Sequence, residues 1–86
     1  MPKISFFYGI AIYMYFNDHH PAHFHAIYGE FNAKIGINDY AMLDGYLPPK
    51  AFSLVVEWAG LHKNELVANW DRMIKKLPFS PISPLE

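Results

Sequence analysis

Four histidines and an aspartate stand close together in the sequence, in a pattern suited to metal binding or proton transfer. The stretch holds four of the five histidines within seven positions and reads Asp18-His19-His20-Pro21-Ala22-His23-Phe24-His25. A His-x-His pair on a strand places two imidazoles side by side, and a loop histidine can fold over as a third ligand. Zinc commonly takes three such nitrogens, or two with a carboxylate, and keeps one position for water.

We therefore predict a metal site that holds zinc or another divalent transition metal. The predicted ligands are His19, His23, His25 and Asp18. The aspartate either binds the metal itself or orients a histidine from outside the ligand shell. This spacing is less specific than a helical His-Glu-x-x-His motif.

The same histidines also fit acid–base chemistry on a phosphodiester, which is an alternative to metal binding. One neutral and one protonated imidazole near about pH 6.5 can take a proton from a ribose hydroxyl and give one to the leaving oxygen. The predicted catalytic residues are then His23, His25 and Lys34, with the lysine holding the phosphate. This alternative describes a ribonuclease-like toxin that needs no metal. The net charge of −1 gives no long-range attraction for nucleic acid, which weighs against it.

A third alternative is a non-catalytic module that pairs with another protein chain. In this case the histidines only populate an exposed sheet face. The outer side of the C-terminal helix carries Leu54, Trp58 and Leu61, and aromatic side chains are enriched at protein interfaces. This side of the helix predicts a homo-oligomer or a small protein partner, unless a loop or tail covers it.

Length and composition indicate one small domain over residues 1–86. The chain is 52% hydrophobic and 17% aromatic, unlike a disordered segment, and the lack of cysteine excludes disulfides and thiolate metal sites. The apolar opening to Phe16 is shorter than a membrane span and has no cleavage pattern of small residues. We therefore predict a cytoplasmic protein that does not enter the membrane.

Hydrophobic alternation predicts the strands that position the histidines. The first strand alternates with period two, and its even-numbered residues face the core. A turn at 17–22 follows, and Gly29-Glu30 then turns the chain back as a two-residue hairpin. The predicted strands cover residues 4–16, 23–28, 31–37 and 41–47.

The register of this hairpin decides where the histidines point. It separates a largely apolar face from a face that carries His23 and His25, with Lys34 directly across from His25. Because a slip of one residue would exchange the two faces, the clean sorting favours this register. We therefore predict that both imidazoles point together out of one face, away from the core.

Apolar residues at helical spacing predict one long helix over residues 49–76. A proline pair starts it, and Gly60 weakens its middle, so a kink is expected over 60–64. Three further prolines leave residues 78–86 as an extended tail. The predicted fold class is α+β: an antiparallel meander of three to four strands with one long or kinked C-terminal helix packed on one face.

Motifs spread over nearly the whole chain resemble a known family. They are Gly9-x-x-x-x-Met14-Tyr15-Phe16-Asn17-Asp18-His19, Pro21, His23-Phe24-His25-Ala26, Tyr28-Gly29-Glu30, Leu47-Pro48 and Glu57-Trp58-Ala59-x-Leu61-His62, with Glu65-Leu66 and Asn69-Trp70. On these residues the chain resembles the domain-of-unknown-function family 4160. The resemblance implies a small prokaryotic protein associated with toxin–antitoxin-like gene pairs, without an assigned activity. His19, His23 and His25 match the family motif, whereas His20 and Gly60 depart from its pattern.

The resemblance and the sorting of faces together predict a small cytosolic accessory or toxin–antitoxin-type protein with a histidine cluster that binds a metal. The resemblance also implies an antitoxin-like protein partner. The ribonuclease-like toxin and the non-catalytic interaction module stand as the two alternatives, and the pattern leaves open whether the protein is an enzyme.

Overall fold

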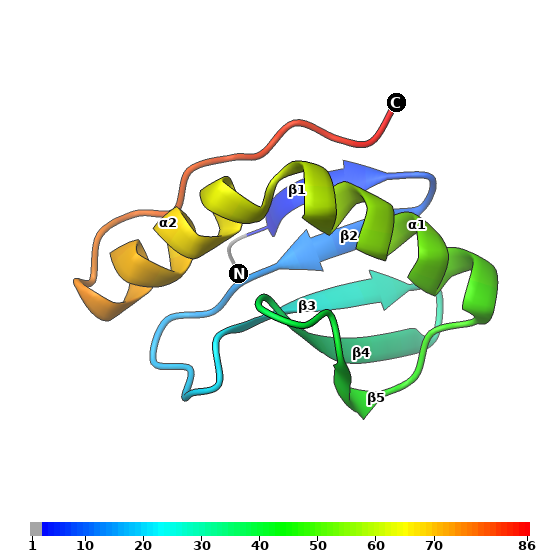
Figure 1. Ribbon diagram of the computed structural model, residues 1–86, viewed down its shortest axis with the longest axis horizontal. Helices are drawn as coiled ribbons and strands as arrows, with labels where there is room; N and C mark the ends of the chain where they lie inside the picture. The colour runs from blue at the N-terminus through cyan, green and yellow to red at the C-terminus, as the bar shows by residue number, and fades with distance from the viewer. Residues whose placement is uncertain (1–2) are drawn as a thin grey trace.

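The computed structural model describes residues 3–86, so residues 1 and 2 of the predicted domain lie outside the described part. Within that part, five strands and two helices follow one another along the chain (Figure 1). Their bounds are β1 Lys3–Phe7, β2 Ile10–Tyr13, β3 His23–Tyr28, β4 Phe31–Gly36, β5 Met42–Gly45, α1 Pro49–Leu61 and α2 Lys63–Ile74. The strands form an antiparallel sheet in the order β1-β2-β3-β4-β5, which is a meander. The predicted α+β class is confirmed, with more strands than expected.

The single strand predicted over residues 4–16 is wrong, because the chain reverses within it. β1 and β2 form a hairpin whose turn is Tyr8-Gly9, with Phe7 opposite Ile10. Both turn residues have positive φ, 49° at Tyr8 and 78° at Gly9, as a type I′ turn requires. A tyrosine rarely adopts this conformation, so this turn has no ordinary sequence signal. As a result Phe6, which was expected in the core, is 55% exposed.

The hairpin predicted at Gly29-Glu30 is present and has the expected register. β3 pairs with β4 so that His25 lies opposite Lys34. Phe24 and Ala26, which alternate with the histidines along β3, are fully buried. Phe24 and Ala26 therefore lie in the core as predicted, whereas His23, which alternates with them, is buried as well.

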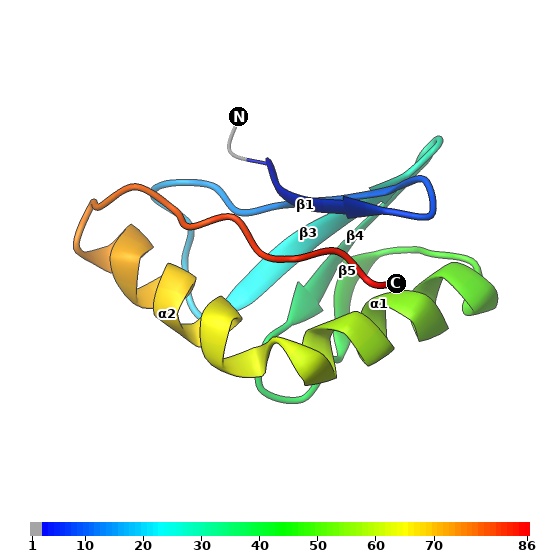
Figure 2. The same ribbon diagram turned by 90° about the horizontal axis from the view of Figure 1, so that it is seen from above.

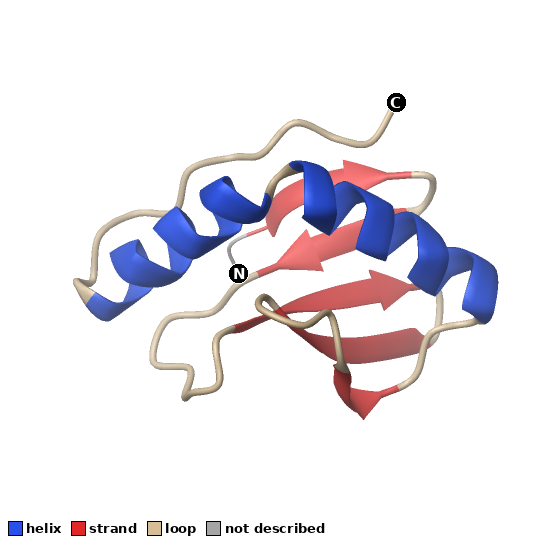
Figure 3. Ribbon diagram, in the orientation of Figure 1, coloured by secondary structure: helices blue, strands red, loops and turns tan. Residues whose placement is uncertain are grey.

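Helices α1 and α2 cover one face of the sheet (Figures 2 and 3). The helix predicted over 49–76 is divided at His62, where the backbone has a φ of −120°; α1 ends and α2 begins at this residue. This division lies within the predicted kink. Neither helix of residues 3–86 combines the length and the apolar character needed to cross a membrane.

Trp58 of α1 lies in the centre of the core and is fully buried. Its ring centroid is 5.2 Å from that of Phe7 and 5.8 Å from that of Phe24. The prediction that Trp58 belongs to an outer, interface-forming side of the helix is therefore wrong. The other possibility, a covering tail, is what the structure shows, because residues 78–86 run in an extended form beside β1 and the helices (Figure 2) and the indole of Trp58 donates to the carbonyl of Ser83.

Candidate metal centre

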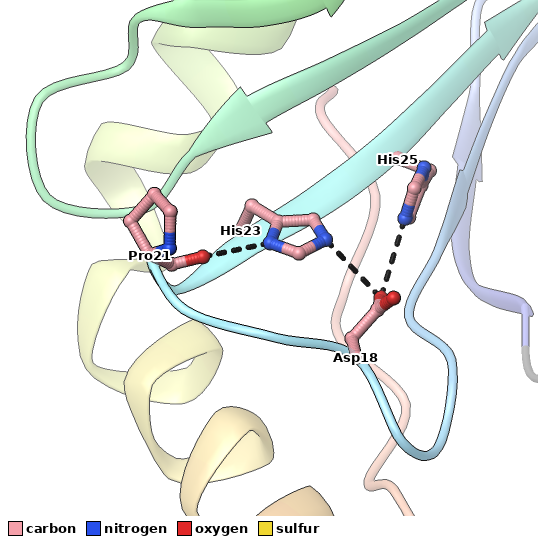
Figure 4. Close-up of polar contacts among 4 residues, drawn as sticks. All are labelled: Asp18, Pro21, His23 and His25. Atoms are coloured by element: carbon pink, nitrogen blue, oxygen red, sulfur yellow. Dashed lines mark hydrogen bonds and ion pairs between the residues drawn. The ribbon is translucent and has the colours of Figure 1, made fainter.

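The loop between β2 and β3 brings an aspartate back to the start of β3. Asn17 has a φ of 67°, a left-handed conformation that asparagine tolerates and that turns the chain. The Asp18 carboxylate then lies beside the rings of His23 and His25, as Figure 4 shows. One ligand atom from each of these three residues lies within 4.8 Å of the others. The three side chains therefore form a compact group of two imidazoles and one carboxylate.

His23 is held in one orientation by the backbone. Its Nδ1 lies 2.7 Å from the carbonyl oxygen of Pro21. Since a carbonyl only accepts, Nδ1 carries the hydrogen and donates it. In a neutral ring this leaves Nε2 with a free lone pair. A backbone carbonyl that fixes the tautomer in this way is typical of metal-binding histidines.

The Nε2 atom of His23 is directed at Asp18. The two atoms Nε2 and Oδ2 are 3.2 Å apart, yet Nε2 is buried without a hydrogen-bond partner among residues 3–86. The distance alone satisfies an ion pair, but two acceptors face each other when His23 is neutral. A cation between them, either a proton or a metal ion, resolves this repulsion.

His25 directs its own Nε2 at the same carboxylate oxygen, at a distance of 3.3 Å. Burial lowers the pKa of His25, outweighing the opposite effect of the Asp18 carboxylate, and His23 and Lys34 add to the lowering. The neutral imidazole, which is the form that binds metals, is thereby favoured. Tyr15 lies edge-on to His25 with ring centroids 4.7 Å apart, and burial raises the pKa of Tyr15, so its hydroxyl stays protonated.

The distances from Asp18 to the two histidines fit a tetrahedral ion. Ligands about 2.0–2.1 Å from a tetrahedral zinc lie roughly 3.3 Å from one another. The separations of 3.2 Å and 3.3 Å from Asp18 Oδ2 to the two histidine nitrogens match that edge length. Two imidazoles and a carboxylate also form the ligand set of several zinc and non-haem iron sites.

The sequence predicts that both imidazoles are exposed, but the structure exposes only one of them. The side chain of His23 is completely buried and that of His25 is 20% exposed. His23 is covered because its ring packs on the indole of Trp70 in α2, with centroids 5.2 Å apart. The prediction that His23 lies on an open surface is therefore wrong, whereas His25 does reach solvent.

The remaining predicted site residues lie outside the three-residue group. His19 is exposed on the loop and is absent from the group of ligands found among residues 3–86. Lys34 sits across from His25 in the register. It lines a shallow polar pocket on the sheet with His25, Asn32, Asp44 and Gly45. This placement suits a contact to a bound molecule better than metal ligation.

Two groups that build the site could not be found from the sequence. The carbonyl of Pro21 fixes the ring of His23, and a backbone group has no side-chain signature. Trp70 covers the same ring, although it is far along the chain. Its place in the apolar stripe of the helix predicts that it is buried, but not which residue it covers.

The fold and the site define this protein as a small α+β domain that groups two histidines and an aspartate where its second strand leads into its third. The chain belongs to the family Domain of unknown function (DUF4160), whose model matches residues 9–71 and so includes all three grouped residues. No curated protein and no solved structure matches the chain.

Proposed function

We propose that this protein binds one divalent transition-metal ion, with zinc as the best fit, through Asp18, His23 and His25. The observation that carries the proposal is the buried Nε2 of His23. This atom has no hydrogen-bond partner among residues 3–86, and it meets the same carboxylate oxygen as His25. Burial of an unpaired polar atom costs about 1–3 kcal/mol, and a metal ion removes that cost.

The ligand count favours a reactive ion over a purely structural one. Structural zinc sites are usually closed by four protein ligands, whereas catalytic sites use three and keep a position for water or substrate. The partial exposure of His25 leaves one side of the group accessible to solvent. Here the ion would act as a Lewis acid or lower the pKa of a bound water.

Elemental analysis and calorimetric titration with Zn²⁺ test the proposal. We expect about one equivalent of metal per chain, and none in a His23→Ala, His25→Ala double variant. His62→Ala is the matched control, because His62 also faces a carboxylate, that of Glu65, at 2.6 Å but lies outside the group. Stoichiometric zinc in the double variant would sink the proposal.

The separate His19→Ala variant decides between the sequence prediction and the geometry. If His19 folds over as a ligand, its loss weakens zinc binding. If the ligands are the three grouped residues, zinc affinity is unchanged within about twofold, because His19 stands exposed outside the group.

A metal-independent ribonuclease-like activity is the second candidate. The position of Lys34 opposite His25, in a shared polar pocket, supports it. The complete burial of the His23 side chain weighs against it, since a general acid or base must come within hydrogen-bond reach of the substrate. RNA cleavage that continues in the presence of a chelator and stops in His25→Ala would favour this candidate over the metal site.

The cellular role that we propose is that of a cytoplasmic accessory or toxin–antitoxin-type protein of prokaryotes, with a small protein partner. The support for this role is the resemblance described for the sequence, together with the exposure of apolar side chains such as Leu61 (68% exposed). A non-catalytic interaction module would share this surface. Light scattering after size exclusion separates the two, since a homo-oligomer that forms without metal favours the module.

A further inference from the structure

The C-terminal tail repeats with a period of three residues, and its burial follows the same period. From residue 78 it reads Pro-Phe-Ser, Pro-Ile-Ser, Pro-Leu-Glu. The middle residue of each repeat faces the protein: Phe79 is partly buried, and Ile82 and Leu85 are buried, whereas the prolines and serines are exposed. Three residues per turn is the repeat of a polyproline II helix, whose φ value proline sets in advance. The tail therefore presents one apolar edge to the domain.

Buried polar side chains of the helices meet the tail backbone at the same spacing. Asn69, which is fully buried, donates through Nδ2 to the carbonyl of Ser80 and accepts from the amide of Ser80 through Oδ1, both at 2.8 Å. One repeat further along, Nε1 of Trp58 donates to the carbonyl of Ser83 at 2.8 Å. Two neighbouring repeats of the tail are thus held by one side chain from each helix, Asn69 of α2 and Trp58 of α1.

The edge of the sheet contributes a further contact to this groove. The amide of Ile82 donates to the carbonyl of Ile4 in β1 at 2.8 Å, in the manner of a strand that adds to a sheet edge. The groove therefore lies between β1 and the two helices, where the tail runs in Figure 2. Its polar groups bind main-chain atoms, and its apolar floor accepts every third side chain.

A groove of this kind needs an extended chain in it. The side-chain amide of Asn69 and the indole N–H of Trp58 are fully buried beneath the tail and bond to its backbone. An extended chain that took the place of the tail would have to offer a main-chain carbonyl to each of these donors. Main-chain recognition of this type also tolerates different sequences, provided that the period of three is kept.

We propose that the groove between β1 and the two helices is a recognition site for an extended, proline-rich segment of another protein, and that the tail is its built-in competitor. The partner segment would carry an apolar residue at every third position, with proline and small polar residues between them. The family match over residues 9–71 includes Trp58 and Asn69 and leaves out both the tail and Ile4 of β1. The tail contributes neither a strand nor a helix to residues 3–86, but its Ile82 and Leu85 belong to the buried core, so a segment that displaces it must supply apolar side chains in their place.

An opened variant of the full chain tests the proposal. Ile82→Asp with Leu85→Asp places charges where the tail meets the apolar floor, which releases it from the groove. We expect this variant to bind a fluorescein-labelled peptide of residues 77–86 at least tenfold more tightly than the unmodified protein, because a tethered tail competes at an effective concentration in the millimolar range. Adding Trp58→Phe, which keeps a ring but removes the indole N–H, should weaken peptide binding several-fold.

The control peptide has the same composition, with the isoleucine and serine of its middle repeat exchanged. It breaks the period of three, so we expect binding at least tenfold weaker than that of the original peptide. An opened variant with an unchanged circular dichroism spectrum that binds neither peptide, or binds both equally, would overturn the proposal.

A second measurement uses the unmodified protein and does not depend on the folding of a variant. In ¹⁵N-labelled protein with an excess of unlabelled peptide at about 10 mM, the Ile82 amide should move towards the position of an unstructured chain while the Trp58 indole signal keeps its bound position. An unmoved Ile82 amide would contradict the proposal. A dimer of the unmodified protein that the peptide dissociates would instead assign the groove to the tail of a second copy.

Discussion

The imidazole of His23 packs on the indole of Trp70, with the two ring centroids 5.2 Å apart. This contact joins the candidate metal ligands on β3 to helix α2. The same indole is also contacted edge-on by His20 from the loop, at 5.6 Å. Trp70 is therefore in direct contact with a candidate ligand and is placed to report on the site.

The first prediction uses Trp70 as that reporter. The chain has two tryptophans, so in a Trp58→Phe variant all tryptophan emission comes from Trp70. We expect Ni²⁺ or Cu²⁺ to quench this emission with a saturating, one-to-one dependence, because the ion would sit on the far side of the His23 ring. Adding His25→Ala should remove the quenching at the same metal concentrations. Quenching that keeps its affinity in that variant would place the metal elsewhere.

The second prediction concerns stability. A ligand that binds the folded state alone stabilises it by about 2.7 kcal/mol at one hundred times its Kd. For a domain of this size, that shift corresponds to a rise in Tm on the order of 10 °C. We expect Zn²⁺ to give such a rise, and Asp18→Asn to reduce it strongly because the carboxylate is where both histidines converge. An equal rise in the Asp18→Asn variant would show that Asp18 is no ligand.

The fold shows where local sequence patterns suffice. The β3–β4 hairpin could be predicted because Gly29 takes the positive φ of its turn, 59°, and because alternation along β3 places Phe24 and Ala26 in the core. The β1–β2 turn could not, since Tyr8 adopts positive φ without belonging to the residue types that favour it. The residues on either side of the turn, Phe7 and Ile10, are buried, so the turn follows from the packing of the hairpin and not from the chemistry of its own residues.

The site divides in the same way. The pairing of His23 with His25 follows from their spacing on one strand, and Asp18 was within reach because it is close in sequence. The burial of His23 could not be predicted, because it depends on the docking of Trp70 from α2. Tertiary packing of this kind leaves no periodic signal in the stretch that it covers.

The third prediction is a dependence of stability on pH in the metal-free protein. Burial lowers the pKa of His25 in the folded state, so the unfolded chain binds a proton more readily at this position. The contribution of His25 to the free energy of unfolding is therefore fully present above the ordinary histidine pKa of about 6.5. It is lost as the pH falls from that value through the lower pKa of the folded state. Urea unfolding in chelator at pH 7.5 and 5.5 should show a smaller loss for His25→Gln than for the unmodified protein. Equal losses would remove His25 from this account.

The last prediction separates two glycines that share a left-handed backbone but differ in their surroundings. Gly29 has a φ of 59° with no atom close to the position of a Cβ, whereas Gly45 has a φ of 74° and a Cβ there would collide with the carbonyl oxygen of Asn32. Gly29→Ala should therefore cost about 1–2 kcal/mol, the strain of the left-handed conformation alone.

Gly45→Ala should cost more, by at least about 1–2 kcal/mol, because the strand β5 must also move away from β4. Urea unfolding of both variants measures the difference. Zinc affinity is the companion measurement: the ligands lie on β3 and the preceding loop, so a folded Gly45→Ala variant should bind zinc as the unmodified protein does. Equal destabilisation by the two substitutions would mean that β5 yields freely. A loss of zinc binding in folded Gly45→Ala would mean that the metal centre depends on β5.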